Sequence, residues 1–110
     1  MKMESGLVRT EIQDHVSVIS LHRQDKRNAF DLALTTALNE ALDQFEDDAD
    51  QWVAVLTGGT DMFSAGSDLK EGSGQTHRGG EYGIIRRKRL KPLIAAAEGL
   101  ALGGGMVILY

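Results

Sequence analysis

Cysteine is absent from this chain of 110 residues, and proline occurs once, at Pro92. Without cysteine there can be no disulfide framework and no thiolate nucleophile. An excess of basic residues is also missing, since the formal net charge is −4. Binding to a phosphate backbone requires a basic surface. These absences argue against a disulfide-stapled domain, a thiol enzyme and a protein that binds nucleic acid.

Long apolar runs are missing as well. No run approaches the roughly 20 residues that span a bilayer, and residues 1–6 lack the apolar core of a signal peptide. The 42% apolar and 25% charged content are ordinary for one soluble globular domain. We therefore expect a cytoplasmic protein that makes no membrane contact. Composition alone does not separate an enzyme from a binding module.

The N-terminal part of the sequence predicts a β-hairpin. Apolar and polar residues alternate from Leu7 to Gln13, which is typical of a half-exposed strand. Asp14 and His15 form a plausible tight turn. The stretch from His15 to Leu21 has apolar residues on both sides, which predicts a second strand covered on both faces. We expect the two strands to pair antiparallel.

A helix and a parallel strand are predicted next. From Asp31 to about Asp47, apolar residues recur at steps of three and four, which indicates an amphipathic helix that Asp31 can cap. The acidic residues 46–50 predict a solvated turn rather than a calcium loop. Trp52 to Thr57 is apolar almost throughout, as in a strand covered on both faces. The order strand, helix, strand predicts a right-handed crossover unit.

The following stretch is rich in glycine and in basic residues. Gly72 to Gly83 holds five glycines without apolar periodicity, which predicts a mobile loop or, at best, a late-forming helix, and such a segment could act as a lid. Ile84 to Leu90 predicts a short helix, and its clustered arginines and lysine are either a solvated face or an anchor for phosphates. Pro92 ends that helix. Leu93 to Ala97 predicts another buried strand.

Two turns of small residues stand out as the functional centre. Residues 61–71 and residues 98–105 each follow a short apolar run. Each turn can bring bare backbone N–H groups up to a ligand oxygen, because no bulky side chain is in the way. Two such turns facing one another would form an oxyanion hole that polarises a carbonyl group. Neither turn has the spacing of a dinucleotide-binding or phosphate-binding loop.

Other kinds of site have weaker support. Ser64 and Ser67 suggest a serine nucleophile, but the GxSxG pattern is missing and no histidine lies close in sequence, although one could be near in space. His15, His22 and His77 share no ligand spacing, which argues against a zinc site. We therefore expect no bound metal.

Four blocks of sequence carry a resemblance to a known family. They are Asn28–Phe30, Val55–Gly58, Phe63–Glu71 and Glu98–Gly105. In order and spacing they resemble the crotonase superfamily of enoyl-CoA hydratases and isomerases. The resemblance implies an α/β fold, the crotonase-like spiral of ββα units, truncated after the glycine-rich turn that opens the central helix. Residues 1–110 would then be a partial acyl-CoA-binding domain, the N-terminal half of the fold.

The same resemblance implies roles for individual residues. The backbone N–H groups of Ser67 and Gly104 would form the oxyanion hole for an acyl-CoA thioester. Residues implied to contact the substrate, from its CoA moiety to its acyl chain, are Lys26, Arg27, Ala29, Ala65, Gly66, Asp68, Leu69 and Gly103. No cofactor is implied beyond the coenzyme A of the substrate. The family also implies a homo-oligomer.

Two departures from the family pattern bear on the reaction. Hydratases of the family carry a catalytic glutamate where this chain has Val107, and the family's second acid lies beyond the matched region. Val107 thus indicates an isomerase-like or divergent parent. Glu98, the carboxylate nearest the glycine turn, has a structural or a catalytic role. The alternative is an inactive half-domain that binds CoA or associates with partner chains. A lone half also predicts exposed strand surface and self-association.

Overall fold

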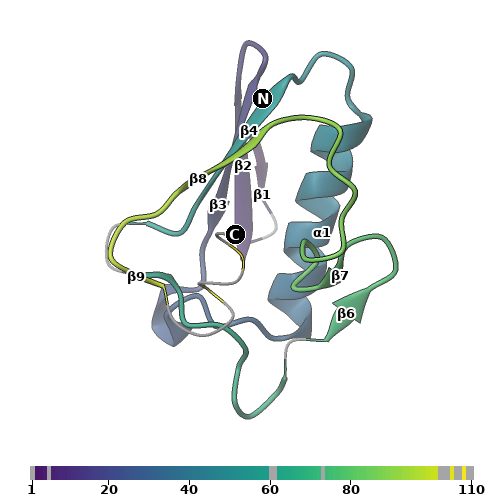
Figure 1. Ribbon diagram of the computed structural model, residues 1–110. Coiled ribbons are helices and arrows are strands. Elements are labelled where there is room, and N and C mark those ends of the chain that lie inside the picture. The colour runs from purple at the N-terminus through teal and green to yellow at the C-terminus, as the bar shows by residue number, and fades with distance from the viewer. Residues whose placement is uncertain are drawn as a thin grey trace.

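The computed structural model describes residues 2–4, 6–59, 62–72, 74–101, 105 and 108. Its main layer is a five-stranded sheet, and helix α1 packs across one face of that sheet (Figure 1). In spatial order the strands are β1 (Lys2–Glu4), β2 (Val8–Gln13), β3 (Val16–Leu21), β4 (Val53–Thr57) and β8 (Leu93–Ala96). Strands β1 to β3 pair antiparallel, whereas β3, β4 and β8 are parallel. This mixed sheet agrees with the predicted α/β class.

The predicted hairpin is confirmed as β2 and β3. Val8 pairs with Leu21 and Gln13 with Val16, and the turn between the strands places Asp14 in the left-handed region at φ 53°. On the α1 side, β3 buries alternate residues, while its other face is only half-buried. Strand β4 shows the same pattern, and Trp52 just before it is 61% exposed. The prediction that both strands are covered on both faces is therefore wrong, because α1 covers one face alone.

Helix α1 (Leu32–Asp47) confirms the amphipathic pattern and its cap. Oδ1 of Asp31 accepts a hydrogen bond from the backbone N–H of Leu34 at 2.9 Å, which satisfies one of the free donors of the first turn. At the other end, Nζ of Lys91 donates to the carbonyls of Phe45, Asp48 and Gln51, each at 2.7 Å. An ammonium group there also suits the negative end of the helix dipole. Lys91 is therefore a structural residue of the basic cluster.

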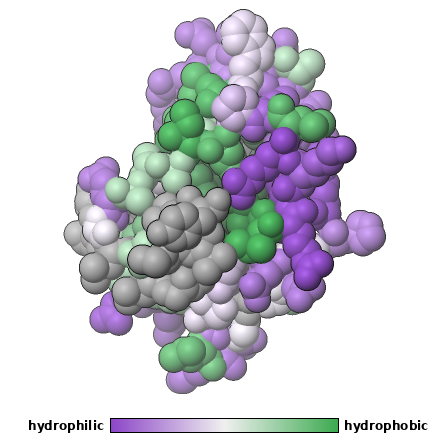
Figure 2. All heavy atoms as spheres, in the orientation of Figure 1, coloured by the Kyte–Doolittle hydropathy of each residue, from purple (hydrophilic) through white to green (hydrophobic). Residues whose placement is uncertain are grey.

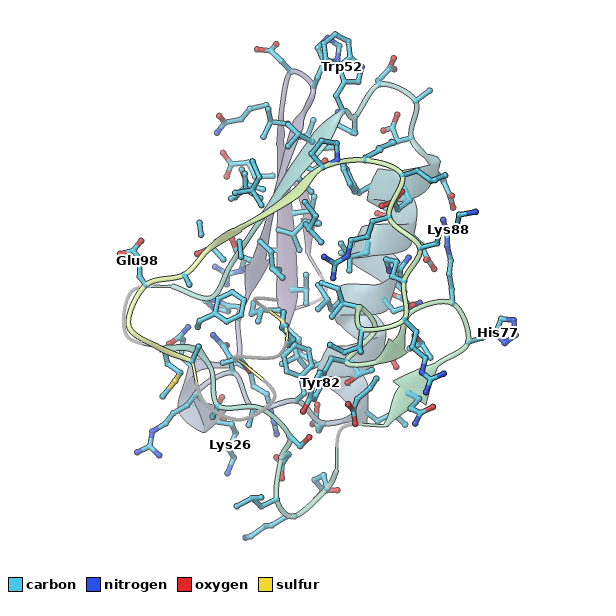
Figure 3. All side chains as sticks on the ribbon, in the orientation of Figure 1. Lys26, Trp52, His77, Tyr82, Lys88 and Glu98 are labelled. Carbon is cyan, nitrogen blue, oxygen red and sulfur yellow. The ribbon has the colours of Figure 1, made fainter. Side chains whose placement is uncertain are left out.

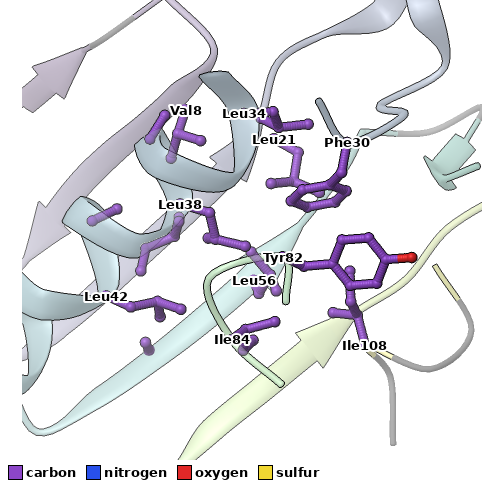
Figure 4. Packing of buried hydrophobic residues seen from close by; sticks show 14 of the residues in the cluster. Val8, Leu21, Phe30, Leu34, Leu38, Leu42, Leu56, Tyr82, Ile84 and Ile108 are labelled. Carbon is purple, nitrogen blue, oxygen red and sulfur yellow. The ribbon is translucent and has the colours of Figure 1, made fainter. Parts of the chain in front are cut away.

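The hydrophobic core lies between α1 and the sheet (Figure 4). Leu34, Leu38 and Leu42 present one stripe of the helix to Leu21 and Leu56 of the sheet. The same core also takes in residues from segments outside α1 and the main sheet, which are Phe30, Phe63, Tyr82, Ile84 and Ile108. The core thus ties the segment around residue 82 to the rest of the domain.

Residues 75–81 form a short hairpin, in place of the mobile loop or late-forming helix that the sequence predicted over residues 72–83. Strands β6 (Gln75–Thr76) and β7 (Gly80–Glu81) pair antiparallel beside α1. The hydroxyl of Thr76 donates to Oδ1 of Asn39 on the helix at 2.8 Å. Gly83 has φ +76°, and a Cβ there would lie 2.6 Å from the carbonyl oxygen of Thr35. This glycine therefore serves close backbone packing on the helix.

Residues 84–90 make turns, so the predicted short helix is wrong. The N–H groups of Ile84 and Ile85 both donate to the carbonyl of Glu81, and that of Arg86 reaches back to Gly79. The reason lies in the side chain of Arg87, which is 1% exposed and bound to α1 through Asp43 at 2.6 Å. Burial of Arg87 against the helix corrects the prediction of one solvated or ligand-binding basic face. Arg86, Lys88 and Arg89 remain exposed.

Strand β8 forms an exposed edge of the sheet, which corrects the prediction of a buried strand. Three of its four residues are exposed, and Ile94 is 54% exposed. Leu90 and Trp52 add further exposed apolar surface at 78% and 61%. Figure 2 shows apolar side chains gathered over the upper part of this face. The expected exposed strand surface is therefore present. In the described part of the chain, no helix has the length and apolar character to cross a bilayer.

Candidate functional site

Two short parallel strands bring the predicted turns together. Strand β5 (Met62–Ser64) pairs with β9 (Leu100–Ala101), with Met62 opposite Leu100 and Ser64 opposite Ala101. Because parallel strands point the same way, the chain leaves both strands at the same edge. Gly105, which is helical, packs so closely that an added Cβ would collide with the carbonyl oxygen of Ser64.

The turn after β5 holds its backbone rigidly around Ser67. The N–H of Phe30 donates to the carbonyl of Gly66 at 2.6 Å, and the N–H of Asp68 donates to the carbonyl of Phe30 at 2.8 Å. In this parallel bridge the peptide groups on either side of Ser67 are hydrogen-bonded to Phe30, whereas the N–H of Ser67 itself points away from Phe30. No acceptor for that N–H is found among the described residues. Gly66 has φ +89°, a conformation that suits glycine.

Asn28 is a buried side chain that holds the backbone leading into this turn. Its side chain is fully buried, and its Nδ2 donates to the carbonyls of Gly58, Met62 and Phe63 at 2.8, 3.2 and 3.1 Å. Its Oδ1 accepts from the backbone N–H of Arg23 at 2.8 Å. One amide side chain thus joins the loop after β3 to both ends of the connection between β4 and β5.

The hydroxyl of Ser64 belongs to the same hydrogen-bond network as Asn28. Its hydroxyl donates to the carbonyl of Asn28 at 2.8 Å and accepts from the N–H of Gly66 at 3.1 Å. The hydroxyl of Ser67 lies against Tyr82 instead. In the described ranges no histidine hydrogen-bonds either serine, and His77 stands on the exposed hairpin (Figure 3). The geometry therefore gives no support to a serine nucleophile.

Asp68 is an anchor of the turn. Its Oδ1 accepts from the backbone N–H groups of Lys70 and Glu71 at 2.9 and 3.0 Å, which confirms its predicted capping role. Its Oδ2 pairs with Arg23 at 3.1 Å. The amides of Glu71 and Lys70, and then the Arg23 guanidinium, hold the pKa of the Asp68 carboxyl below its ordinary value. The carboxylate is therefore ionised at neutral pH, and both of its oxygens are bound by groups of the protein.

Arg23 connects this anchor to the start of α1. Its Nη1 donates to the carbonyl of Ala29 at 2.7 Å, and its Nη2 pairs with the cap residue Asp31 at 3.2 Å. The guanidinium group thus fixes the turn, the loop after β3 and the helix relative to one another. Sequence reasoning missed Arg23, because its neighbours in the charged loop give no sign of which side chain turns inward.

The remaining predicted contact residues fall into two groups. Lys26 and Arg27 are exposed, on and just after the short 3₁₀ helix η1 (Gln24–Lys26), and Lys26 projects from the lower end of the molecule (Figure 3). The carbonyl of Arg27 accepts from the N–H of Ala65 at 3.1 Å, so this basic loop adjoins the Ser67 turn. Ala29 and Ala65 are half-buried. Leu69 is fully exposed, at 101%.

Some predicted residues lie outside the described part of the chain. These are Gly103, Gly104 and Val107. Glu98 is described, and its exposed side chain points away from the body of the protein (Figure 3). A catalytic role for Glu98 stays a prediction.

Tyr82 is a site residue that sequence reasoning missed. Its hydroxyl oxygen lies 2.8 Å from Oγ of Ser67, and its ring packs on Phe30 with centroids 5.0 Å apart. The residue is 5% exposed and has φ 59°. A single tyrosine within a glycine-rich stretch gave no signal of this contact, because the hairpin of β6 and β7 is what brings it to the turn.

Two large hollows on the surface lie away from the Ser67 turn. One, of about 550 Å³, lies between α1 and β2 and includes Thr10 and Phe45. The other, of about 540 Å³, lies on the opposite face of the sheet and includes Val18 and His22. Neither includes Ser67. In the ranges that the structure describes, no group of three or more histidine or acidic side chains could hold a metal ion.

Comparison with known proteins identifies the family. The sequence pattern described as enoyl-CoA hydratase/isomerase matches residues 11–110. The chain belongs to this family, the crotonases. The mevalonyl-coenzyme A hydratase sidH of Aspergillus fumigatus is 36% identical over 99 residues, which is 83% of this chain and 37% of that protein. The enoyl-CoA hydratase EchA19 of Mycobacterium tuberculosis is 34% identical over 110 residues, with 90% and 41% covered.

Solved structures show the crotonase fold for this chain. A probable enoyl-CoA hydratase/isomerase from Mycobacterium abscessus superposes with a TM-score of 0.87 at 36% identity, over 96% of this chain and 43% of that one. An enoyl-CoA hydratase from Mycobacterium tuberculosis H37Rv gives 0.84 at 40% identity, over 93% and 42%. The chain thus spans about two fifths of the length of the crotonases that it matches.

Proposed function

We propose that this crotonase chain binds an acyl-CoA thioester at the turn after β5, where the backbone N–H of Ser67 donates to the thioester oxygen. As the second donor we propose the backbone N–H of Gly104, which follows β9 in the sequence. The observation that carries the proposal is the Ser67 N–H, which has no acceptor in the described structure although both neighbouring peptide groups are bonded to Phe30. The parallel pairing of β5 and β9 supports the partnership of the two turns.

The chemistry of a thioester fits such a site. Its carbonyl oxygen gains negative charge when an α-proton leaves or when a nucleophile adds at the β-carbon. Donors that are already fixed in place stabilise that charge without reorganisation, and the loss of one donor of this kind costs about 10²- to 10³-fold in rate. The turn around Ser67 is fixed in this sense, by Asn28 below it and by Asp68 beside it.

Lys26 and Arg27 provide positive charge for the phosphates of the CoA moiety. Both are exposed on the loop that adjoins the turn at Ala65. The relatives' names describe hydratases acting on mevalonyl-CoA and (E)-benzylidenesuccinyl-CoA, among others. For this chain we propose hydratase or isomerase chemistry of the parent fold, with Val107 standing where the hydratases' glutamate is expected.

A second candidate is a non-catalytic domain that binds CoA or associates with partner chains, itself included. The exposed edge strand β8, with Ile94 54% exposed, favours association, because such an edge can pair with another chain. A non-catalytic domain that binds CoA would use the same site as the enzyme, whereas one that only associates with partner chains would not need it.

Calorimetry with two CoA ligands tests the proposed function. One ligand is a ketone analogue, in which a methylene replaces the thioester sulfur and the carbonyl is kept. The other is an alkyl thioether, which has no carbonyl. We expect the wild-type chain to bind the ketone about 10-fold more tightly, because the amide donors act only on that oxygen. Ser67→Pro deletes one donor and should remove most of this preference.

Ser67→Ala is the matched variant for that experiment. It loses the hydroxyl but keeps the N–H, so the preference for the ketone should persist. Circular dichroism of each variant checks that the fold is kept. Equal affinity of the wild-type chain for both ligands, or no binding of either, would contradict the proposed function.

A further inference from the structure

The hollow between α1 and β2 lies apart from the Ser67 turn and has a mixed lining. Its volume of about 550 Å³ is within the range of cavities that hold small molecules. Strands β2 and β3 line it with Thr10, Ile12 and Ser17, and α1 lines it with Ala41 and Phe45. Because the side chain of alanine is a single methyl group, the helix leaves space above the sheet at Ala41.

Thr10 is a polar side chain in this hollow that the fold leaves unused. It shares the α1 face of β2 with Val8, which packs beside the helix (Figure 4), because alternate residues of a strand point the same way. Thr10 is only 8% exposed, and no residue in the described ranges hydrogen-bonds its hydroxyl. Every fully enclosed polar side-chain atom of those residues has a partner, so the Thr10 oxygen is open to the hollow. The hydroxyl is therefore free to donate a hydrogen bond.

The register of the sheet explains why Thr10 has no partner. Across the β2–β3 pair Thr10 lies opposite Ile19, whereas Ser17 lies opposite Ile12. The hydroxyl of Ser17 donates to Oε1 of Gln51 at 2.7 Å, and Nε2 of Gln51 donates to the carbonyl of Asp14 at 3.0 Å. These bonds fix the wall beside Thr10 without using its hydroxyl. A ligand would thus meet a preformed surface, which lowers the cost of ordering.

The charged side chains that line the hollow are acidic. They are Asp43, Asp47 and Asp48, and none of the described lining residues is basic. Asp43 and Asp47 pair with Arg78, and Oδ1 of Asp48 accepts from the backbone N–H of Asp50 at 2.9 Å. The carboxylates therefore have partners within the protein, but they disfavour a negatively charged ligand, because like charges repel.

We infer that the hollow between α1 and β2 is a second binding site, which takes uncharged small molecules with an apolar body and an acceptor oxygen. The apolar body lies against Ile12, Ala41 and Phe45, and the oxygen accepts the hydrogen of the Thr10 hydroxyl. The residues that line the hollow do not include Ser67, so the site is separate from the turn after β5. The inference goes beyond the proposed function and does not depend on it.

Nuclear magnetic resonance of the ¹⁵N-labelled 110-residue chain, titrated with three indoles, tests the inference. Indole-3-ethanol carries a hydroxyl, 3-ethylindole has no oxygen and indole-3-acetate carries a carboxylate, while the ring and the two-carbon substituent stay the same. We expect indole-3-ethanol to shift the resonances of Thr10, Ile12 and Ala41 with a dissociation constant of about 1 mM. Indole-3-acetate should bind about 10-fold more weakly, because its charge faces the carboxylates.

Thr10→Val separates the hydroxyl from the shape of the hollow, since valine has nearly the same volume. The affinity for indole-3-ethanol should fall about 5-fold, as expected for one net hydrogen bond. The affinity for 3-ethylindole should not fall, because that ligand has no oxygen to accept the bond. Thr36→Val is the matched control, which removes a hydroxyl from an exposed position of α1 and should leave both affinities unchanged.

Four results would overturn the inference. The first is the absence of any saturable shift with indole-3-ethanol, and the second is a set of shifts centred on Val18 and His22 across the sheet. The third is an equal effect of Thr10→Val on the two uncharged indoles. The fourth is binding of indole-3-acetate as tight as that of indole-3-ethanol. None of these results bears on the proposed function, whose test concerns the Ser67 turn.

Discussion

Replacing Asn28 with alanine is expected to lower the free energy of unfolding by about 4 kcal/mol. The side chain is fully buried, the two hydrogens of Nδ2 are shared among three backbone carbonyls, and Oδ1 accepts from one backbone N–H. Alanine would leave the carbonyls of Met62 and Phe63 without this donor in a space closed to water, whereas the carbonyl of Gly58 keeps its hydrogen bond from Gln24. Each buried group left unpaired costs about 1–3 kcal/mol, and relaxation of the loop recovers part of the sum.

Backbone conformation adds to this loss. Asn28 has φ 53°, a region that asparagine tolerates better than alanine does. Asn28→Gly removes the same hydrogen bonds without the conformational strain, so it should be about 1 kcal/mol more stable than Asn28→Ala. Urea unfolding followed by circular dichroism measures both differences. A loss of less than about 1 kcal/mol in Asn28→Ala would contradict the role given to this side chain.

The second large effect is expected for Arg87→Met, a loss of about 3 kcal/mol in unfolding free energy. The guanidinium reaches Asp43 at 2.6 Å and Oδ1 of Asn39 at 2.6 Å, and its Nε reaches the carbonyl of Gly83. Methionine keeps most of the volume but none of the donors. The loss stays at the lower end for a broken buried pair, because Asp43 is 31% exposed and also meets Arg78 at 3.3 Å.

Arg86→Met is the matched control for this prediction. Arg86 is the neighbouring arginine and is exposed, so its substitution should change the unfolding free energy by no more than about 0.5 kcal/mol. Thermal and urea unfolding of both variants give the comparison. Equal effects of the two substitutions would show that the Arg87 pair does not stabilise the segment that carries Tyr82.

The parts of the fold that could be predicted are those with a local cause. The alternation around Val8 and Thr10, the tight turn at Asp14 and the cap at Asp31 each depend on a few neighbouring residues. The degree of burial of β8, and of the faces of β3 and β4 that point away from α1, could not be predicted in the same way. An apolar run shows that a strand can be covered, and whether anything covers it depends on the rest of the molecule.

The same distinction holds for residues 72–90. Glycine is the residue for mobile loops, but it is also required where backbones approach closely, and Gly83 is used in the second way on α1. Likewise, the sequence of a basic cluster does not show which of its members is buried against an acidic partner. Arg87 pairs with Asp43, which lies 44 residues away in the sequence.

The position of the candidate site along the backbone could be predicted from the sequence, but the side-chain contacts around it could not. Small residues after an apolar strand, together with the family resemblance, pointed to the turn at Ser67. The hydroxyl of Tyr82 reaches that turn only through the β6–β7 hairpin, and Arg23 reaches Asp68 across 45 residues. Contacts of this kind depend on the tertiary fold and leave no periodic signal.

Nuclear magnetic resonance of the ¹⁵N-labelled chain, titrated with the ketone analogue of an acyl-CoA, tests the central claim most directly. If the Ser67 N–H holds the acyl oxygen, its proton resonance should move downfield with ligand concentration, and its exchange with solvent should slow. The resonance of Gly104 should respond with it. A Ser67 resonance that stays in place, while those of Thr10 and Phe45 at the hollow beside α1 move, would contradict the account.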